Sequence, residues 1–481
     1  MLCVLLLRTN YYYKILEQVI TKIKKNVLIF WVITILFLIK GIYYCFYIPP
    51  WEAPDEPGHV NYVLFLYHNK SIPGTKIMPT FNGVHYVYQK NHILPKLQKG
   101  GDAVFNRNSF KLRMPLGTIE GNPPFYYLYL MPFYILSLGL NGYFSFIFLR
   151  FGSLLLGTFT VIFVYHIVKL LYPKSKTIPN LVYFLVAFQP MFTFMSSVVN
   201  SDSLVTLLFV LLMYVILRFI ILAKNTSIMT TLLVLSVAGA AALTKPQMVI
   251  AIPIAISSLF FVKKTNINKI ITLFLTSIAM PLIWYLSRYI QIGAQAFSYP
   301  FTEVQKYPLP LWKYPVAFIL GKQPIGIFMS FWGYFGWINV PMPKFIYLLF
   351  FLIVLISVIG WVTYLREKNN YPKDLKRASL FLYFSSIIYI ITIFTYDLLT
   401  YTKTYHFVIQ GRYFMPILFI VILFILQGIM FYNKKLTKFF IFLCITILIL
   451  SQVLMYISIS RFYYQKLQLI SPITSFYVSQ K

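Results

Sequence analysis

Long runs of apolar residues, separated by short polar stretches, make up most of this 481-residue chain. Many of these runs reach the ~20 residues that a helix needs to cross a bilayer. Backbone polar groups inside a bilayer must pair within the segment, so these runs are predicted to be helices. The pattern predicts an all-α polytopic membrane protein with about eleven, and at most thirteen, transmembrane helices. The predicted spans are 27–48, 145–171, 180–199, 203–223, 228–244, 246–262, 270–291, 344–365, 378–397, 413–432 and 439–459.

One further apolar stretch, 124–140, is either a twelfth span or a helix at the membrane surface. Lysine and arginine in short loops concentrate on the cytoplasmic side, so their positions distinguish the two. With the N-terminus inside and 124–140 on the outer surface, every later basic cluster falls inside. Counting 124–140 as a span moves those clusters outside. Eleven spans are therefore favoured. The clusters include Lys169, Lys174, Lys176, Lys263, Lys264, Lys373, Lys376, Arg377, Lys434 and Lys435.

The predicted organisation is a single membrane domain, 1–481, without an internal repeat. Residues 1–26 are predicted to be a cytoplasmic or interfacial lead-in, because their short apolar run lacks a cleavage site for a signal peptide. Two long extracytoplasmic loops are predicted, 49–144 and 291–343, and the first carries short interfacial helices. The second contains "PIGIFMSFWGYFGWINVPMP", which is apolar but broken by Gly and Pro, as in segments that lie on or dip into the interface.

Composition supports the membrane class: 59% of the residues are hydrophobic and only 11% are charged, against about 25% charged in soluble domains. The net charge of +31 is interpreted as a topology signal and as attraction to anionic lipid, not as a nucleic-acid surface. The three cysteines show no zinc spacing, and no metal site is predicted. The predicted location is the inner or plasma membrane of a bacterial cell.

Acidic residues are rare and segregate to one side. The chain has 11, and the predicted topology places eight of them outside. The acids were not used to choose the topology, so their segregation is independent of it. The polar chemistry of this protein is therefore predicted to face outward. The outer acids are Glu52, Asp55, Glu56, Asp102, Glu120, Asp202, Glu303 and Asp397.

The densest acidic stretch is "PPWEAPDEPGH", Pro49–His59, directly after the first predicted span. Asp55 and Glu56 are candidates for catalysis, since charge at a membrane mouth is expensive and tends to be functional. The alternative is that both acids cap a helix, where they stabilise its N-terminus by roughly 0.3–1 kcal/mol. Both interpretations are compatible, because a cap also fixes the carboxylate in place. His59 is predicted to be a helix residue near the carboxylates and not a metal ligand.

Other outer loops supply candidate substrate-binding residues, each with a structural alternative. Asp202 can cap the helix that follows it, and Lys245 can anchor at headgroup level or bind phosphate. Arg412 opens a span from the outside, and its fork of donors matches phosphate geometry. With these, the candidate substrate-binding residues are His59, Glu120, Asn122, Asn200, Asp202, Lys245, Gln410, Arg412 and Tyr413.

The motifs "APDEPGH", "NPPFYY", "NSDSL", "LTKPQ", "SFWGYFGW" and "IQGRYFMP", in that order, resemble those of a bacterial family of predicted membrane proteins of unassigned function. The resemblance covers about 40–460. That family is in turn similar to the GT-C class of membrane glycosyltransferases, which includes polyprenyl-phosphate-dependent mannosyltransferases and aminoarabinose transferases. Many of those carry a soluble C-terminal domain, whereas only about 20 residues follow the last predicted span here.

The resemblance implies that a carboxylate in the first outer loop is the base, and that the donor is a sugar on a polyprenyl phosphate. Asp55 would accept the acceptor's proton, while Glu56 would orient the acceptor or bind a divalent cation, and the resemblance implies no other cofactor. Arg412 and Lys245 would stabilise the leaving phosphate. The sugar would be transferred to an envelope glycan or lipid acceptor. A single displacement predicts inversion at the anomeric carbon. Two alternatives stay open: a transporter or flippase for a lipid-linked or anionic solute, and a non-catalytic envelope-assembly protein.

Overall fold

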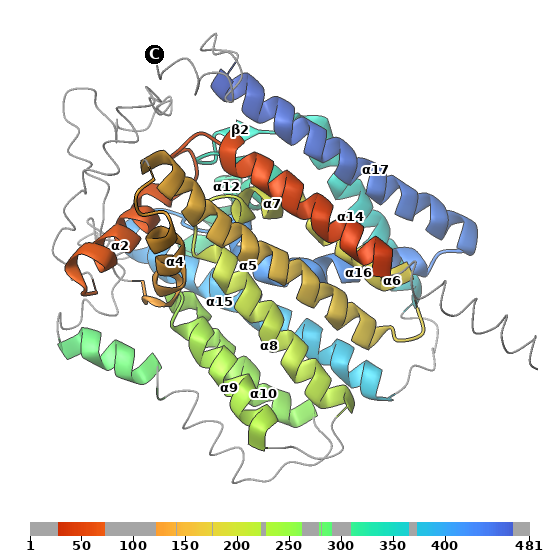
Figure 1. Ribbon diagram of the computed structural model, residues 1–481. Coiled ribbons are helices and arrows are strands. Elements are labelled where there is room, and N and C mark those ends of the chain that lie inside the picture. Colours follow the sequence, from red (N-terminus) through yellow and green to blue (C-terminus); the bar gives the residue numbers. More distant parts are fainter. Residues whose placement is uncertain are drawn as a thin grey trace, which may run out of the picture.

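Most of the described chain is helical, and its long helices lie side by side (Figure 1). The computed structural model describes residues 27–72, 122–140, 142–175, 177–222, 228–261, 279, 281–290, 309–364 and 373–464. Within these ranges the sheet structure is one short antiparallel pair, β1 (Tyr334–Phe335) with β2 (Val340–Pro341). The predicted all-α class is therefore confirmed.

Within the described residues, seven helices are long and apolar enough to cross a membrane, and nine if each of two bent pairs counts as one span. The seven coincide with predicted spans; the count of eleven stays a prediction, and half of 270–291 lies outside the described residues. The seven are Val27–Tyr47, α5 (Gly142–Leu171), α8 (Asp202–Leu222), α14 (Lys344–Tyr364), α15 (Lys373–Thr404), η5 with α16 (Gly411–Ile417, Leu418–Met430) and α17 with η6 (Lys434–Ile459, Ser460–Tyr464).

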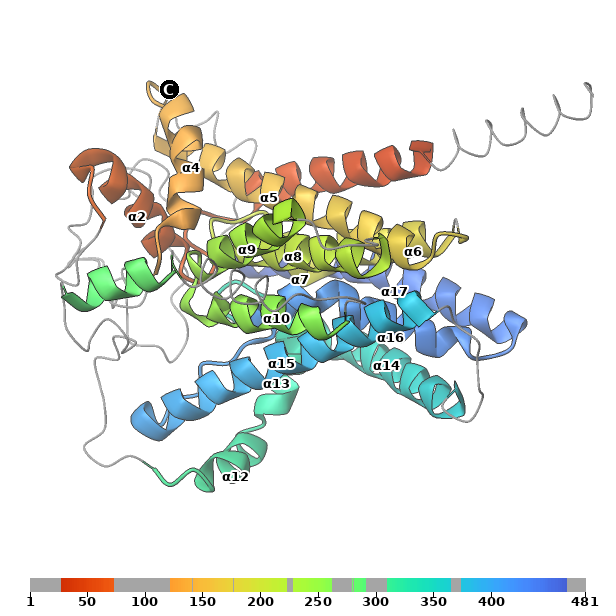
Figure 2. The same cartoon turned by 90° about the horizontal axis from the view of Figure 1, so that it is seen from below.

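Shorter helices occupy the predicted spans 228–244 and 246–262 and parts of the first predicted loop. The stretch 124–140 contains only a 12-residue helix, α4, which is too short to cross a bilayer by itself. Together with α2 it lies at one end of the helix bundle (Figures 1 and 2). The shorter helices are α2 (Glu56–Asn69), α4 (Phe125–Leu136), α9 (Ile228–Ala242), η2 (Pro246–Ile250), α10 (Ala251–Ser257) and η3 (Ser258–Phe261).

The third predicted span is broken into α6 (Thr177–Ala187) and α7 (Pro190–Ser196), which meet at 64°. Proline cannot donate a backbone hydrogen bond, so carbonyls before it lose their helical partners. Neighbouring helices supply replacements. Lys40 Nζ donates to the carbonyl of Ala187 at 2.8 Å, and Gln452 Nε2 donates to that of Phe188 at 2.7 Å. These contacts explain a lysine inside an apolar span.

A second bent pair, α12 (Lys313–Leu320) and α13 (Gln323–Gly333), turns by 61° and ends in the β1–β2 hairpin. It projects from the side of the bundle in Figure 2. Most of α13 and the hairpin belong to the Gly- and Pro-broken segment that is expected to dip into or lie on the interface. Tyr314 ties α12 to α15 by donating to Asp397 Oδ2 at 2.7 Å. At the other end, α13 packs on Gly411, where an added Cβ would lie 2.0 Å from Phe331 N.

Small residues allow α14 and α16 to approach closely. A Cβ on Gly360 would lie 2.0 Å from the carbonyl oxygen of Gly428, and Ser357 Oγ donates to the carbonyl of Ile425 at 3.0 Å. Glycine and serine contacts of this kind are typical of helix pairs in membranes, where close backbone packing replaces the hydrophobic effect.

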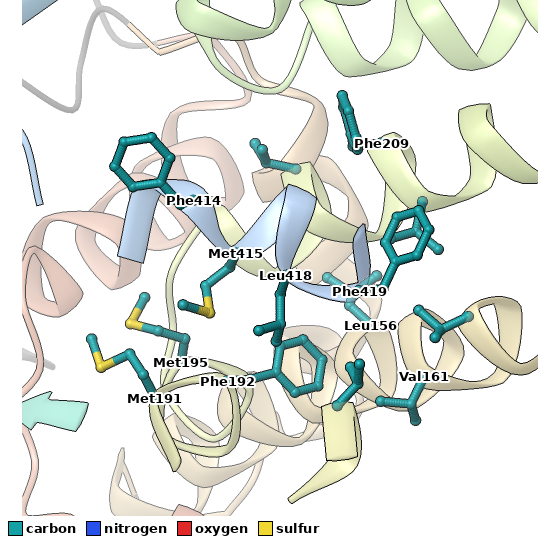
Figure 3. Close-up of a cluster of buried hydrophobic side chains, with 14 of the residues drawn as sticks. Leu156, Val161, Met191, Phe192, Met195, Phe209, Phe414, Met415, Leu418 and Phe419 are labelled. Carbon is teal, nitrogen blue, oxygen red and sulfur yellow. The ribbon is translucent and has the colours of Figure 1, made fainter. Parts of the chain in front are cut away.

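The apolar core reaches the segment that carries Arg412. Figure 3 shows Met191 and Met195 of α7 beside Met415, and Phe192 beside Leu418. Phe414 and Met415 lie two and three residues after Arg412 in η5 and are themselves buried. The position of the Arg412 backbone is therefore set by a close-packed apolar cluster, and only its side chain enters a polar environment.

Candidate functional site

Asp55 occupies the N-cap position of α2 but does not act as a cap. Its backbone is left-handed, with φ 65°, and its side chain makes no capping hydrogen bond. Only its carbonyl serves the helix, by accepting from His59 N at 3.1 Å. Aspartate is one of the few residues other than glycine that tolerate this conformation. Of the two interpretations of "PDE", capping by the Asp55 side chain is therefore wrong, and its carboxylate is directed elsewhere.

The Asp55 carboxylate contacts Arg412, which links it to charged groups from two further segments. Arg412 Nη2 donates to Asp55 Oδ2 at 2.7 Å. The Arg412 Nε atom lies 3.9 Å from Asp202 Oδ2, and Lys245 Nζ donates to Asp202 Oδ1 at 2.6 Å. We call Asp55, Asp202, Lys245 and Arg412 the ionic cluster. It joins the turn before α2, the start of α8, the turn before η2 and η5.

Exposure divides the ionic cluster into an outer and an inner part. The Asp55 side chain is 39% exposed, whereas those of Lys245, Asp202 and Arg412 are only 10%, 6% and 4% exposed. Asp202 Oδ2 and Arg412 Nε are buried and have no hydrogen-bond partner among the described residues, and the same holds for Gln410 Oε1. Buried polar atoms in native proteins are nearly all paired. Two of these atoms, Asp202 Oδ2 and Arg412 Nε, lie 3.9 Å apart inside the cluster and therefore favour a site for a ligand.

Asn200 and Tyr413 support the cluster. Asn200 Oδ1 accepts from Asp202 N at 2.9 Å, and its Nδ2 donates to the carbonyl of Pro54 at 3.2 Å. The amide thus ties the start of α8 to the turn that carries Asp55. The Tyr413 ring lies 4.8 Å from Lys245 Nζ and 5.2 Å from Arg412 Cζ, distances at which a ring face attracts a cation.

His59 lies beside the cluster in a chain of polar aromatic contacts. Its Nδ1 and the Tyr127 hydroxyl are 3.0 Å apart, and Asn122 Nδ2 donates to the same hydroxyl at 3.3 Å. The Tyr62 ring stacks on Tyr127 with centroids 3.6 Å apart. Burial lowers the pKa of His59 to about 4, although Asp55 acts in the opposite direction. His59 is therefore neutral at pH 7. Glu120 lies outside the described residues.

Asp55 is ionised at neutral pH. Desolvation by burial raises its pKa, but this is outweighed by the charge of Arg412, by His59, by the hydrogen bond from Arg412 and by Lys245, so the pKa is lowered from its usual value. Asp55 is thus held as an anion by the cation behind it. Its ability to accept a proton depends on whether Arg412 remains in contact.

Glu56 lies apart from the ionic cluster. Its carboxylate is fully buried and forms a two-pronged pair with Arg150, at 2.8 Å from Nε and 2.7 Å from Nη2. It also accepts from Val199 N at 2.9 Å and Trp51 N at 3.2 Å. We correct the expectation that Glu56 orients an acceptor or binds a cation, because all of its accepting positions face protein donors in the interior.

Arg150 was missed by the sequence analysis. Besides Glu56, it donates to the carbonyls of Cys45 at 2.8 Å, Ile48 at 2.5 Å and Pro49 at 3.2 Å. It therefore anchors the end of the first helix and the start of "PPWEAPDEPGH". The signal was present, since an arginine inside the apolar run 145–171 needs an interior partner.

Asp397 positions the segment that leads to Arg412. Its Oδ1 accepts from Val408 N at 2.7 Å and from Ile409 N at 2.9 Å, and its other oxygen accepts from Tyr314. The carboxylate is buried. Asp397 is thus a structural support for the Arg412 segment and does not contact the ionic cluster.

The arrangement suits an anion better than a metal ion. Among the described residues, no three His, Cys, Asp or Glu side chains gather to hold a metal, and both carboxylates of the ionic cluster already face protein cations. Arg412 and Lys245 lie on either side of Asp202, and arginine and lysine are the side chains that bind phosphate. Next to these cations stands a partly exposed carboxylate able to accept a proton.

Comparisons with known proteins place the chain in a family. A family model described as "Predicted membrane protein (DUF2142)" matches residues 37–421. No curated protein matches the sequence.

Solved structures similar to the chain include three at low identity. ArnT from Cupriavidus metallidurans in the apo state is 14% identical, with a TM-score of 0.37, over 64% of this chain and 49% of ArnT. The Archaeoglobus fulgidus oligosaccharyltransferase in complex with Zn and sulfate is 11% identical, with a TM-score of 0.40, over 71% of this chain and 44% of that protein. Its apo form is 10% identical, with a TM-score of 0.45, over 89% and 56%. The chain thus spans about half the length of these proteins.

Proposed function

We propose a function from one premise: this chain belongs to the DUF2142 family of predicted membrane proteins. It is a membrane protein with several apolar helices, and the ionic cluster is its candidate site. The proposed activity is transfer of a sugar from a polyprenyl-phosphate carrier to an envelope glycan or lipid acceptor. The proposal that a sugar is transferred rests on the resemblance of the motifs to GT-C transferases. The proposals of phosphate binding and of a catalytic base rest on the geometry of the cluster.

The observation that carries the proposal is the pairing of a half-exposed carboxylate, Asp55, with two buried cations, Arg412 and Lys245. Arg412 and Lys245 would hold the phosphate of the donor. Asp55 faces outward, where an acceptor hydroxyl can reach it. A base within hydrogen-bond reach of the attacking hydroxyl and cations at the leaving oxygen are what a single displacement requires.

The charges of the cluster balance through this reaction. Asp55 and Asp202 carry two negative charges, Arg412 and Lys245 carry two positive charges, and His59 is neutral. The donor is a phosphodiester with one negative charge. As the bond from the sugar to the phosphate oxygen breaks and the bond to the acceptor oxygen forms, the phosphate gains a second negative charge. The acceptor proton moves to Asp55 and neutralises it, so the total charge in the site is unchanged.

The test is sugar transfer from a polyprenyl-phospho-sugar in reconstituted membranes. Asp55→Asn keeps the size of the side chain and tolerates the left-handed backbone, so the protein should fold. Loss of a general base typically costs 10²–10⁴-fold, about 3–6 kcal/mol in the barrier at ~1.4 kcal/mol per tenfold. Transfer should fall by that factor in Asp55→Asn.

A matched control is Asp374→Asn, which makes the same chemical change in the first turn of α15. That variant should transfer at the wild-type rate. If folded Asp55→Asn protein also transfers at the wild-type rate, Asp55 is not the base and the proposed mechanism is wrong.

The proposal also places the site on the extracytoplasmic face of a bacterial inner membrane. The test is labelling with a membrane-impermeant thiol reagent in intact cells. A cysteine at the exposed His406, in the segment before Arg412, should be labelled. Cysteines at Lys174 and Lys373 should be protected, and the wild-type chain measures the background. Labelling at Lys174 and Lys373 without labelling at His406 would invert the orientation.

Transport of a lipid-linked or anionic solute is the second candidate. The observation that favours it is the presence of two bent helix pairs, α6–α7 and α12–α13, since broken helices are common in transporters. A wild-type protein that moves such a solute across liposome membranes, but transfers no sugar, would favour this function over the transferase.

A further inference from the structure

The Asp55–Arg412 pair blocks the cation that the proposed phosphate needs. The Arg412 side chain is 4% exposed and the Asp55 side chain is 39% exposed. Arg412 Nη2 is engaged with Asp55 at 2.7 Å, and Nη1 lies 3.5 Å from the carbonyl oxygen of Pro54. The two terminal nitrogens of the guanidinium, Nη1 and Nη2, are thus directed at the turn that carries Asp55. An anion approaching from the exposed side meets a carboxylate first.

On the inner side, by contrast, the guanidinium is incompletely paired. Arg412 Nε and Asp202 Oδ2 lie 3.9 Å apart and neither has a hydrogen-bond partner among the described residues. Lys245 takes the other oxygen of Asp202. Asp202 is therefore fixed to Lys245, while Arg412 is shared between two carboxylates. The contact that can be exchanged without exposing a buried charge is the outer one, with Asp55.

We infer that the Asp55–Arg412 ion pair is a gate: the phosphate of the donor displaces the Asp55 carboxylate from Arg412, and the displaced carboxylate turns outward to the acceptor. This rests on the proposed function and adds regulation to it. Phosphate and carboxylate both accept hydrogen bonds from a guanidinium, and Asp55 engages only Nη2 of Arg412. Because the Asp55 side chain is partly exposed, solvent can hydrate its carboxylate on the outer side when the contact with Arg412 is lost.

Displacement also changes the chemistry of Asp55. The groups that face it from the packed elements are Arg412 of η5, Lys245 before η2 and His59 of α2, with Asp202 of α8 behind Arg412. Arg412 is the largest favourable influence on the Asp55 anion. When a phosphate anion replaces the Asp55 carboxylate at Arg412, the carboxylate loses its cationic partner and gains a negatively charged neighbour. Its proton affinity rises, so Asp55 becomes a stronger base when the donor is bound.

The gate predicts an effect that a simple base does not: removing Asp55 should tighten phosphate binding. The experiment measures the dissociation constant of a short-chain polyprenyl monophosphate by isothermal titration calorimetry, with the purified full-length chain in detergent at one fixed salt concentration. Asp55→Asn should bind this probe about tenfold more tightly than the wild type, or more. Arg412→Gln should bind it more weakly.

A double-mutant cycle separates the gate from a general effect of charge. In the Arg412→Gln background, Asp55→Asn should give little or no gain, because the released donor is absent. Asp55→Gly, which also suits the positive φ, is a second variant without the carboxylate and should behave like Asp55→Asn. Thermal unfolding of each variant verifies that the binding measurements report folded protein.

The outcomes are distinct. A gain in affinity that requires Arg412 supports the gate. Unchanged or weaker binding by Asp55→Asn and Asp55→Gly overturns it, as does an equal gain with and without Arg412. The proposed function is tested separately by sugar transfer. Tighter binding by an Asp55→Asn variant that still transfers sugar at the wild-type rate would support the gate and reject Asp55 as the base.

Discussion

Asp55 and Glu56 are neighbours in the sequence, and each forms an ion pair with a buried arginine, but the two pairs differ in the exposure of the carboxylate and in their further hydrogen bonds. Glu56 and Arg150 are fully buried, and each makes several further hydrogen bonds to backbone groups. Asp55 is 39% exposed, and its partner Arg412 leaves Nε unpaired among the described residues. The hydrogen-bonding groups of the Glu56–Arg150 pair are satisfied within the protein, whereas those of the Asp55–Arg412 pair are only partly satisfied.

The difference separates a structural pair from a functional one. A buried ion pair is tolerated when all its donors and acceptors are satisfied, and breaking it leaves an uncompensated charge. The Glu56–Arg150 pair meets that condition and fixes the turn in which Asp55 lies. The Asp55–Arg412 pair has unused hydrogen-bonding capacity, which suits a partner that comes and goes. Sequence position alone does not distinguish the two acids.

The largest expected effect breaks the complete pair. Glu56→Gln should lower the free energy of unfolding by about 3–5 kcal/mol, because Arg150 is left as a buried, unpaired charge. The measurement is the midpoint of thermal or denaturant unfolding in detergent. Arg150→Gln should act in the same direction. Asp55→Asn is the control, and a Glu56→Gln variant as stable as Asp55→Asn would show that the two pairs do not differ.

A smaller effect concerns the histidine beside the incomplete pair. The pKa of His59 is lowered to about 4, against about 6.5 in an unfolded chain. Between these values the unfolded chain binds a proton that the folded chain does not, so stability falls as the pH drops from about 6.5 to 4. At ~1.36 kcal/mol per pH unit, the loss is up to about 3 kcal/mol.

The measurement is the unfolding midpoint as a function of pH. His59→Gln should lose less stability over this pH range than the wild type, because its side chain does not titrate. A His59→Gln variant with the same acid sensitivity as the wild type would show that other groups cause it.

The smallest effect is on the stability contributed by Asp55 itself. Its pKa is lowered in the folded protein, so its contribution is present above the ordinary pKa of an aspartate and is lost as the pH falls through the lowered value. Because the side chain is 39% exposed, solvent screening limits that contribution to about 1 kcal/mol or less. Asp55→Asn should therefore unfold within a few degrees of the wild type at pH 7. A large drop in the unfolding midpoint would show that Asp55, like Glu56, is needed for stability.

The sequence predicted much of the site but not its internal division. Asp55, Asp202, Lys245 and Arg412 were singled out because each follows or precedes an apolar run on the same predicted side, and the structure brings all four together. Periodicity locates helix ends, so it locates residues at those ends. It does not show which of two adjacent acids points inward, since that depends on Arg150, 94 residues away from Glu56.

The hydrophobic pattern of the sequence also did not predict the breaks within the helices. The run 180–199 was expected to be one span, yet it bends between α6 and α7. Pro190 marks the position, but proline is tolerated in a membrane helix when neighbours satisfy the freed carbonyls. Those neighbours are Lys40 and Gln452, which are 147 and 264 residues away from their partners. Contacts of that separation do not appear in local hydrophobic periodicity.

The contact between Lys40 and Ala187 also has a consequence for the order of assembly. Lys40 lies in the first apolar helix, and its acceptor is 147 residues further along the chain. A lysine in the apolar part of a membrane helix costs up to about 2.5–3.5 kcal/mol during insertion, the upper values applying at the helix centre. In a chain made from its N-terminus, the first helix must bear this cost until α6 has been synthesised and has docked. The first helix is therefore expected to be among the last to reach its final depth in the bilayer.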